Sequence, residues 1–246
     1  MIHTKHRQPQ YHRWRRLTFR AYSRAGCLAL LLSFAYFSVS TESAQAQDGP
    51  REAYIPILCV TAGDKPTGMV VYLLLLFADR DDTDGLNVHF LSGPGRFSDK
   101  SKIATRQAIT DAAHAMGLST DTWNVGISMP YPGLLLDGDS LSAMVSLTVV
   151  AMARGETVPP RHVISGTVTS DGHIGPVSHV GLKVAAANQA GLLTIILPPT
   201  TPNGWHPPAS VQVSRVSTVR QAYQALMAPR HLFADGHSRK SDADQS

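Results

Sequence analysis

The chain has 246 residues, of which 43% are hydrophobic and 16% charged, and this length suits one domain with a full hydrophobic core. Its formal net charge is +4, but without residues 1–46 it keeps 15 basic and 17 acidic residues, so the charge balance does not predict nucleic-acid binding. Outside that segment Cys59 is the only cysteine, which excludes an internal disulfide there and leaves the fold to its core.

The N-terminal segment has the pattern of a secretory signal peptide. Residues 1–26 are basic and lack acidic side chains, residues 27–39 are apolar, and Ala44-Gln45-Ala46 offers a small-residue cleavage site. The apolar run is shorter than the roughly 20 residues that a membrane-spanning helix needs. We therefore predict a signal peptide at 1–46 and export to the periplasm or exterior, with an uncleaved anchor in the inner membrane as the alternative.

The rest of the chain divides by composition into three parts. Residues 47–53 are polar and are predicted to be a linker. Residues 54–228 carry the periodic apolar patterns expected of a folded domain. The tail at 229–246 is polar and charged, which predicts disorder.

Within the domain, apolar periodicity and turn residues predict strands that alternate with helices. This order predicts an α/β (α+β) fold in which helices pack on a mixed sheet. The expected strands are 54–60, 68–78, 86–91, 124–128, 162–168, 173–177, 192–197 and 211–213, with 67–91 forming a hairpin, and the expected helices are 98–116, 141–152, 180–189 and 218–227.

A serine at the start of the second predicted helix is the first candidate for chemistry. Ser142 follows the turn Gly138-Asp139-Ser140 and would lie in the first helical turn. Backbone N–H groups there lack helical partners and can bind an oxyanion, so one segment could supply both a nucleophile and its oxyanion donors. The alternative is that Asp139 or Ser140 caps the helix and Ser142 is a solvated hydroxyl.

The third predicted helix carries a lysine that could act as the base. Lys183 is the only lysine between Lys102 and Lys240, and its neighbours in sequence are mostly apolar. Burial would lower its pKa and leave a neutral amine able to accept the proton of a serine. Ser165, at the end of a predicted strand, could hydrogen-bond that amine. The alternative is a surface lysine whose stem covers apolar area.

Taken together, these segments resemble the proteolytic domain of the Lon family. The turn Asp137-Gly138-Asp139-Ser140-Leu141-Ser142 is similar to the family's D/E-G-x-S turn, and most similar to its archaeal-type form E-G-D-S-A-S. Ser165-Gly166 resembles the T-G pair, and residues 176–183 resemble the segment P-[IV]-G-G-x-x-x-K that carries the lysine. The resemblance extends over roughly residues 55–228.

This resemblance implies a serine peptidase with a Ser/Lys dyad. It implies that Ser142, the second serine of the turn, is the nucleophile and Lys183 the general base. Ser165 would support the lysine, and the backbone N–H of Ser142 would contribute to the oxyanion site. Asp139 would either cap the helix or form a resting ion pair with Lys183, which would raise the lysine's pKa and silence it.

The sequence departs from the family pattern at three places and lacks an ATP-binding loop. Ser178-His179 stands where the family has Gly-Gly, Ser165 stands where it has threonine, and the turn Thr169-Ser170-Asp171-Gly172 lacks the family's usual arginine-glycine. No G-x-x-x-x-G-K-[ST] pattern occurs. We therefore expect ATP-independent cleavage of unfolded or flexible polypeptides, with no cofactor, no metal and no nucleic-acid partner. A homo-oligomer is compatible with the family's tendency to form rings.

Two alternatives to this reading remain at the level of sequence. The first is a catalytically silent Lon-like module for binding or chaperoning polypeptides, which the altered Gly-Gly position favours. The second involves His162, His173 and His179, as a Ser142–His179 pair or a metal site. Metal-ligand spacing such as H-E-x-x-H does not occur, which argues against the metal site.

Overall fold

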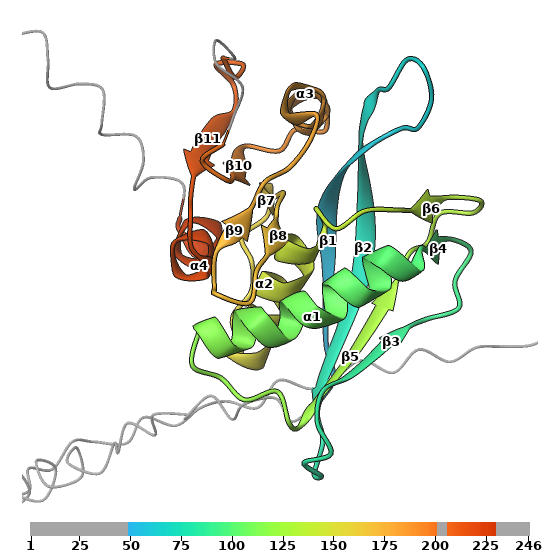
Figure 1. Cartoon of the computed structure of the whole chain (residues 1–246), viewed down its shortest axis with the longest axis vertical. Coiled ribbons are helices and arrows are strands. Elements are labelled where there is room, and N and C mark those ends of the chain that lie inside the picture. The colour runs from blue at the N-terminus through green and yellow to red at the C-terminus, as the bar shows by residue number, and fades with distance from the viewer. Residues whose placement is uncertain (1–48, 201–205, 230–246) are drawn as a thin grey trace, which may run out of the picture. The chain divides into compact units, whose positions relative to one another are not determined.

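The computed structural model of this chain describes residues 49–200 and 206–229 (Figure 1). The predicted signal peptide at 1–46 lies outside the described residues, and so does the predicted tail apart from residue 229. The first strand begins at Arg51, so the last three residues of the predicted linker at 47–53 belong to the fold.

A four-stranded sheet forms the larger part of the framework. It consists of β1 (Arg51–Val60), β2 (Gly68–Asp79), β5 (Trp123–Ser128) and β3 (Asn87–Phe90), side by side in that order (Figure 1). β1 and β2 form a long antiparallel hairpin in which Arg51 is opposite Phe77. Inward-facing residues of these strands, among them Leu73, Leu75 and Ile127, are fully buried and supply much of the core.

The predicted hairpin at 67–91 is wrong. β5 lies between β2 and β3, antiparallel to the first and parallel to the second. Parallel neighbours need a crossover connection, and the helix α1 (Asp99–Ala115) supplies it between β3 and β5. The sequence places two apolar strands on either side of a turn, but this alone does not exclude a third strand between them.

Two helices of the first half are explained by their sequences. Ser98 caps α1 by accepting a hydrogen bond from the Ser101 N–H, and Gly117 follows the helix with a φ of +74°. α2 (Ser142–Ala153) is buried from residue 142 to 152, which agrees with its mostly apolar and β-branched composition. It packs between α1 and the hairpin of β1 and β2.

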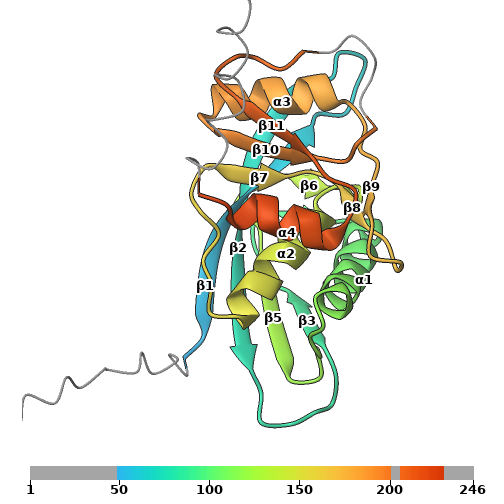
Figure 2. The ribbon, with the colours of Figure 1, turned by 90° about the vertical axis from the view of Figure 1, so that its left-hand side faces the viewer.

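The second half adds a parallel sheet and the helix that contains Lys183. β11, β10 and β7 lie side by side, with α4 packed against β10 and β7 (Figure 2). α3 packs instead against β1 and β2. The elements of this half and the two small sheets are β7 (His162–Ile164), β10 (Thr194–Leu197), β11 (Gln212–Arg215), α3 (Val180–Gln189), α4 (Val219–Met227), β4 (Arg96–Phe97) paired with β6 (Leu135–Leu136), and β8 (Thr167–Val168) paired with β9 (Ile174–Gly175).

The predicted fold class is confirmed: helices pack on mixed and parallel sheets in an α+β arrangement. The short β4–β6 pair was not predicted, because two-residue strands carry no periodic signal. Within the described ranges, no helix is both long enough and apolar enough to cross a bilayer.

Candidate active site

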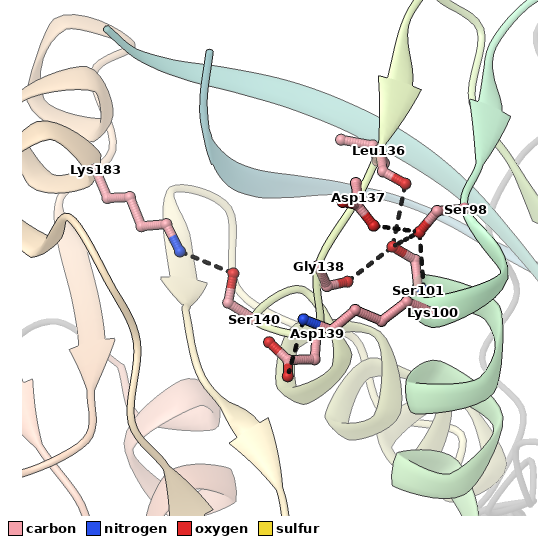
Figure 3. Close-up of polar contacts among 9 residues, drawn as sticks. All are labelled: Ser98, Lys100, Ser101, Leu136, Asp137, Gly138, Asp139, Ser140 and Lys183. Carbon is pink, nitrogen blue, oxygen red and sulfur yellow. Dashed lines mark hydrogen bonds and ion pairs between the residues drawn. The ribbon is translucent and has the colours of Figure 1, made fainter. Parts of the chain in front are cut away.

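The turn before α2 and the first turn of α3 meet through one hydrogen bond. Lys183 Nζ donates to Ser140 Oγ at 2.8 Å (Figure 3). Gly138, with a φ of +120°, bends the chain ahead of Ser140 into a conformation that side-chain-bearing residues rarely adopt. Ser140 is half-buried, so its hydroxyl lies at the boundary between the core and solvent.

Lys183 is buried, with only 4% of its surface exposed. Burial lowers the pKa of its amine to about 8, against the opposing influence of Cys59 and Asp139, which favour the charged form. A lysine with this pKa is neutral in a substantial fraction of molecules at mildly alkaline pH. The predicted burial of Lys183 agrees with this exposure and the alternative of a surface lysine does not, so its amine is suited to accept a proton.

Ser165 lies at the break between β7 and β8, where only 1% of it is exposed. Its hydroxyl accepts a second hydrogen bond from Lys183 Nζ, at 3.2 Å. The backbone of this segment also holds the serine turn, because the Gly166 N–H donates to the Ser140 carbonyl at 3.0 Å. The structure therefore brings Ser165, Lys183 and Ser140 together.

Ser142, the predicted nucleophile, does not take part in this arrangement. Its hydroxyl belongs to the first residue of α2, only 1% of the residue is exposed, and no hydrogen bond joins it to Lys183 in the described structure. Its N–H donates to the Asp139 carbonyl at 2.9 Å and is not free for an oxyanion. The serine within reach of the lysine is Ser140.

Asp139 fills neither of its two predicted roles through its side chain. The carboxylate lies 4.0 Å from Lys100 Nζ (Figure 3), and its side chain is 47% exposed. The N-cap of α2 is Leu141, which receives no side-chain hydrogen bond. Asp139 acts on Lys183 only at longer range, where its negative charge raises the lysine's pKa.

Two backbone N–H groups next to Ser140 are available to a ligand. In the described part of the chain, the N–H groups of Asp139 and Ser140 have no protein acceptor. Unpaired amides beside a nucleophile are the donors that an oxyanion needs. The sequence predicted the Ser142 N–H as an oxyanion donor, whereas the N–H groups without an acceptor belong to Asp139 and Ser140, which precede the helix.

Two of the three candidate histidines, His162 and His173, have partners outside the serine turn, and Cys59 is a poor nucleophile. His162 Nδ1 lies 2.9 Å from the Leu226 carbonyl oxygen, and His173 pairs with the Asp171 carboxylate at 3.1 Å. Among the described residues, no group of three His, Cys, Asp or Glu side chains is arranged to hold a metal. Burial raises the pKa of the Cys59 thiol to about 11, so it stays protonated at neutral pH and is unsuited to act as a nucleophile.

A serine hydroxyl and a buried lysine amine at hydrogen-bond distance form the arrangement that a Ser/Lys hydrolase requires. Comparison with known proteins gives this arrangement a family. Residues 96–211 match the model of the Lon protease (S16) C-terminal proteolytic domain. The matched region includes Ser140, Ser165 and Lys183, so the part of the chain that holds the candidate site is similar to the Lon proteolytic domain.

Curated relatives agree with this family at low identity. The chain is 29% identical to a Lon protease of Mycolicibacterium smegmatis over 54% of its length, and 26% identical to a Lon protease of Halothermothrix orenii over 42%. It is also 23% identical to the DNA repair protein RadA of Halalkalibacterium halodurans over 52%. These matches span only 18%, 14% and 28% of the respective relatives, so the chain corresponds to one part of each.

Proposed function

We propose that the domain is a serine endopeptidase in which Ser140 is the nucleophile and Lys183 the general base. The observation that carries the proposal is the 2.8 Å hydrogen bond between these side chains, made by a lysine that is 4% exposed. A nucleophile next to a base of lowered pKa is the requirement for covalent catalysis by serine. Ser165, 3.2 Å from the same amine, orients the lysine.

The chemistry proceeds through an acyl-enzyme. Neutral Lys183 accepts the Ser140 proton as Oγ bonds to the substrate carbonyl carbon, and the carbonyl oxygen takes up negative charge. The free N–H groups of Asp139 and Ser140 stabilise that oxyanion. The peptide C–N bond then breaks, and the lysine gives its proton to the departing amine. Lys183 then deprotonates a water molecule as its oxygen bonds to the ester carbonyl carbon. The ester C–O bond breaks, and the lysine returns its proton to Ser140 Oγ.

We further propose that the substrates are unfolded or flexible polypeptides and that cleavage needs no ATP. The 246 residues contain no Walker A pattern for nucleotide binding. The signal-like segment at 1–46 supports action outside the cytoplasm, in the periplasm or beyond it.

One observation favours a second candidate function, a Lon-like module that binds polypeptides without cleaving them. The relative named as a DNA repair protein matches 52% of this chain, which shows that similarity to this domain is not limited to proteins named as proteases. In that case the lysine and serine would serve the fold, and the domain would bind a partner without turnover.

Digestion of an unfolded protein such as reduced casein, without ATP, separates these functions. We expect Ser140→Ala and Lys183→Met each to lower the rate at least about a hundredfold, the usual range for removing a nucleophile or base. Ser142→Ala should stay within a few fold of the parent, because its hydroxyl makes no bond to the lysine. The reverse pattern would restore Ser142 as nucleophile. A folded parent that binds but does not cleave casein would establish the silent module.

A further inference from the structure

The N-terminal end of α1 is bonded to the turn that carries Ser140. Ser98 Oγ donates to Asp137 Oδ1 at 2.6 Å, and the Ser98 N–H donates to the Leu136 carbonyl at 2.9 Å. Ser101 Oγ lies 2.8 Å from the Gly138 carbonyl oxygen and 3.1 Å from that of Leu136 (Figure 3). Two serines of one helix thus contact three consecutive residues of the turn.

A count of protons identifies the bond that matters most. The Ser98 hydroxyl gives its single proton to Asp137, and its oxygen accepts the Ser101 N–H as the helix cap. The Leu136 carbonyl already receives the Ser98 N–H. The Ser101 hydroxyl also lies 3.1 Å from Ser98 Oγ. The Ser101 proton therefore goes to the shortest of its three contacts, the Gly138 carbonyl, which has no other donor in the described structure.

That bond fixes the peptide unit next to the nucleophile. The Gly138 C=O and the Asp139 N–H belong to one planar trans peptide and point in opposite directions. Holding the carbonyl toward α1 directs the Asp139 N–H away from α1, and this N–H has no protein acceptor. Gly138 has a φ of +120° and no side chain, so without the bond this plane could rotate.

We propose that Ser101 is a positioning residue, which presents Ser140 and the Asp139 N–H by anchoring the Gly138 carbonyl to α1. This proposal rests on the proposed function. The residue is fully buried and cannot reach a substrate, so it acts only through the turn. On the other side of the nucleophile, Gly166 holds the Ser140 carbonyl at 3.0 Å, and the turn is thus anchored at both ends.

The same helix supplies a matched control. Thr105 lies one turn further along α1, is also fully buried, and its hydroxyl has no hydrogen-bond partner in the described structure. Ser101→Ala and Thr105→Val each remove one buried hydroxyl from α1. Only the first removes a bond to the serine turn.

Steady-state hydrolysis of a fluorogenic peptide by the full chain tests the proposal. We expect Ser101→Ala to lower kcat about tenfold with KM within twofold of the parent, because an interaction that serves the transition state is lost. The acidic limb of the pH profile, along which activity falls as Lys183 becomes protonated, should stay in place, since the surroundings of Lys183 are unchanged. Thr105→Val should match the parent. Equal losses in both variants, or a loss confined to KM, would overturn the proposal.

A second measurement does not depend on catalysis. The Ser142 N–H donates to the Asp139 carbonyl at 2.9 Å, so its hydrogen exchange reports the order of the turn. We expect Ser101→Ala to speed exchange at this amide at least fivefold while amides in α4 keep their parent rates, and Thr105→Val to leave it unchanged. Unchanged exchange in Ser101→Ala would overturn the proposal even if the parent proves inactive, whereas parental inactivity alone contradicts only the proposed function.

If Ser101→Ala does not fold, Asp137→Ala provides the same comparison from the solvent side. Asp137 is exposed and its loss removes only the bond from Ser98 Oγ. We expect a smaller change in the same direction, about threefold in kcat and in Ser142 exchange. No change in either quantity would contradict the anchoring of the turn by α1.

Discussion

The two halves of the candidate site are held in different ways. The turn that carries Ser140 is held by directed hydrogen bonds from Ser98 and Ser101. The helix that carries Lys183 is held by close packing: a side-chain carbon added at Gly68 of β2 would lie 2.1 Å from the Leu182 carbonyl oxygen. The serine half should therefore be sensitive to the loss of a polar group, and the lysine half to the gain of a single carbon.

The halves also differ in the electrostatic free energy that burial costs. Ser140 is neutral and half-buried, so its partial burial costs little free energy. Lys183 is 4% exposed and pairs with two hydroxyls, with no carboxylate in direct contact. Its burial destabilises the charged amine, and the same penalty yields the base that hydrolysis requires.

The largest effect we predict concerns the pH dependence of cleavage. Only neutral Lys183 can accept the serine proton, and burial lowers its pKa to about 8. Below that pH, kcat/KM should fall tenfold per unit, or roughly a hundredfold from pH 8 to pH 6. A profile measured with an uncharged peptide checks this. A flat profile between these values would show that the lysine is not the base.

Asp139 offers a way to shift the acidic limb of the pH profile, along which kcat/KM falls as Lys183 becomes protonated. Its charge raises the pKa of Lys183, so Asp139→Asn should shift the limb to lower pH and increase activity at neutral pH. Asp137→Asn is the matched control, because Asp137 has no such influence on the lysine and the new amide oxygen can still accept the Ser98 bond. Equal shifts in both variants would point to a general effect of charge.

The second prediction measures the cost of the buried lysine. Unfolded chains hold the lysine proton up to the ordinary pKa of 10.5, whereas the folded protein releases it at about 8. The unfolded state therefore binds more protons between these values, and the stability of the parent should rise with pH across this window. Below pH 8, Lys183→Met should be more stable than the parent by roughly 3 kcal/mol, at about 1.4 kcal/mol per pKa unit.

Urea denaturation at a series of pH values provides the measurement. The advantage of Lys183→Met should shrink from pH 8 upward and be nearly gone by pH 10.5. Because other groups titrate alike in both proteins, the difference between the two curves isolates the lysine. Parallel curves would mean that the amine remains solvated in the folded protein.

The sequence predicted the lysine half better than the serine half. Apolar neighbours around Lys183 indicated burial, and packing against the sheet is what such a pattern produces. Ser140 and Ser142 are two residues apart in one turn, and the family resemblance favoured Ser142, whereas the hydrogen bond to the lysine is made by Ser140. A signal was present: the mostly apolar sequence of α2 begins after Leu141, so Ser142 inside it is buried, whereas Ser140 before it is half-buried.

The contacts that anchor the serine turn could not be predicted in the same way. Ser98 was recognised only as part of the start of a helix, and Ser101 as an ordinary helical residue. Their bonds to Asp137 and Gly138 join segments nearly 40 residues apart in sequence. Such pairs depend on where the crossover helix α1 lies against the turn, which local periodicity does not encode.

The third prediction addresses the packed half directly. Gly68→Ala should destabilise the protein by about 2 kcal/mol, because the new carbon meets the rigid backbone of α3 and the helix must move. The shift should also lengthen the contact between Lys183 and Ser140 and lower kcat. Gly49→Ala is the control, since nothing lies within 4 Å of its added carbon. Thermal unfolding and peptide hydrolysis of both variants would show whether close packing against Gly68 holds α3 in place.

The smallest effect concerns the residue just before α3. His179 has a φ of +55°, a left-handed conformation that costs a side-chain-bearing residue roughly 1–2 kcal/mol. Glycine relieves that strain but loses more freedom on folding, about 0.5–1 kcal/mol. His179→Gly should therefore stabilise the protein by only about 0.5–1 kcal/mol.

The control for His179→Gly is Arg161→Gly, at the other described non-glycine residue with positive φ, 66°. Both changes should raise the unfolding temperature, but only His179 directly precedes α3, the helix that contains Lys183. If the strain at His179 also sets the direction of α3, His179→Gly alone will change kcat. If kcat stays constant while stability rises, the packing of α3 on Gly68 is sufficient to place the lysine, and the Ser178-His179 departure from the family pattern has no bearing on catalysis.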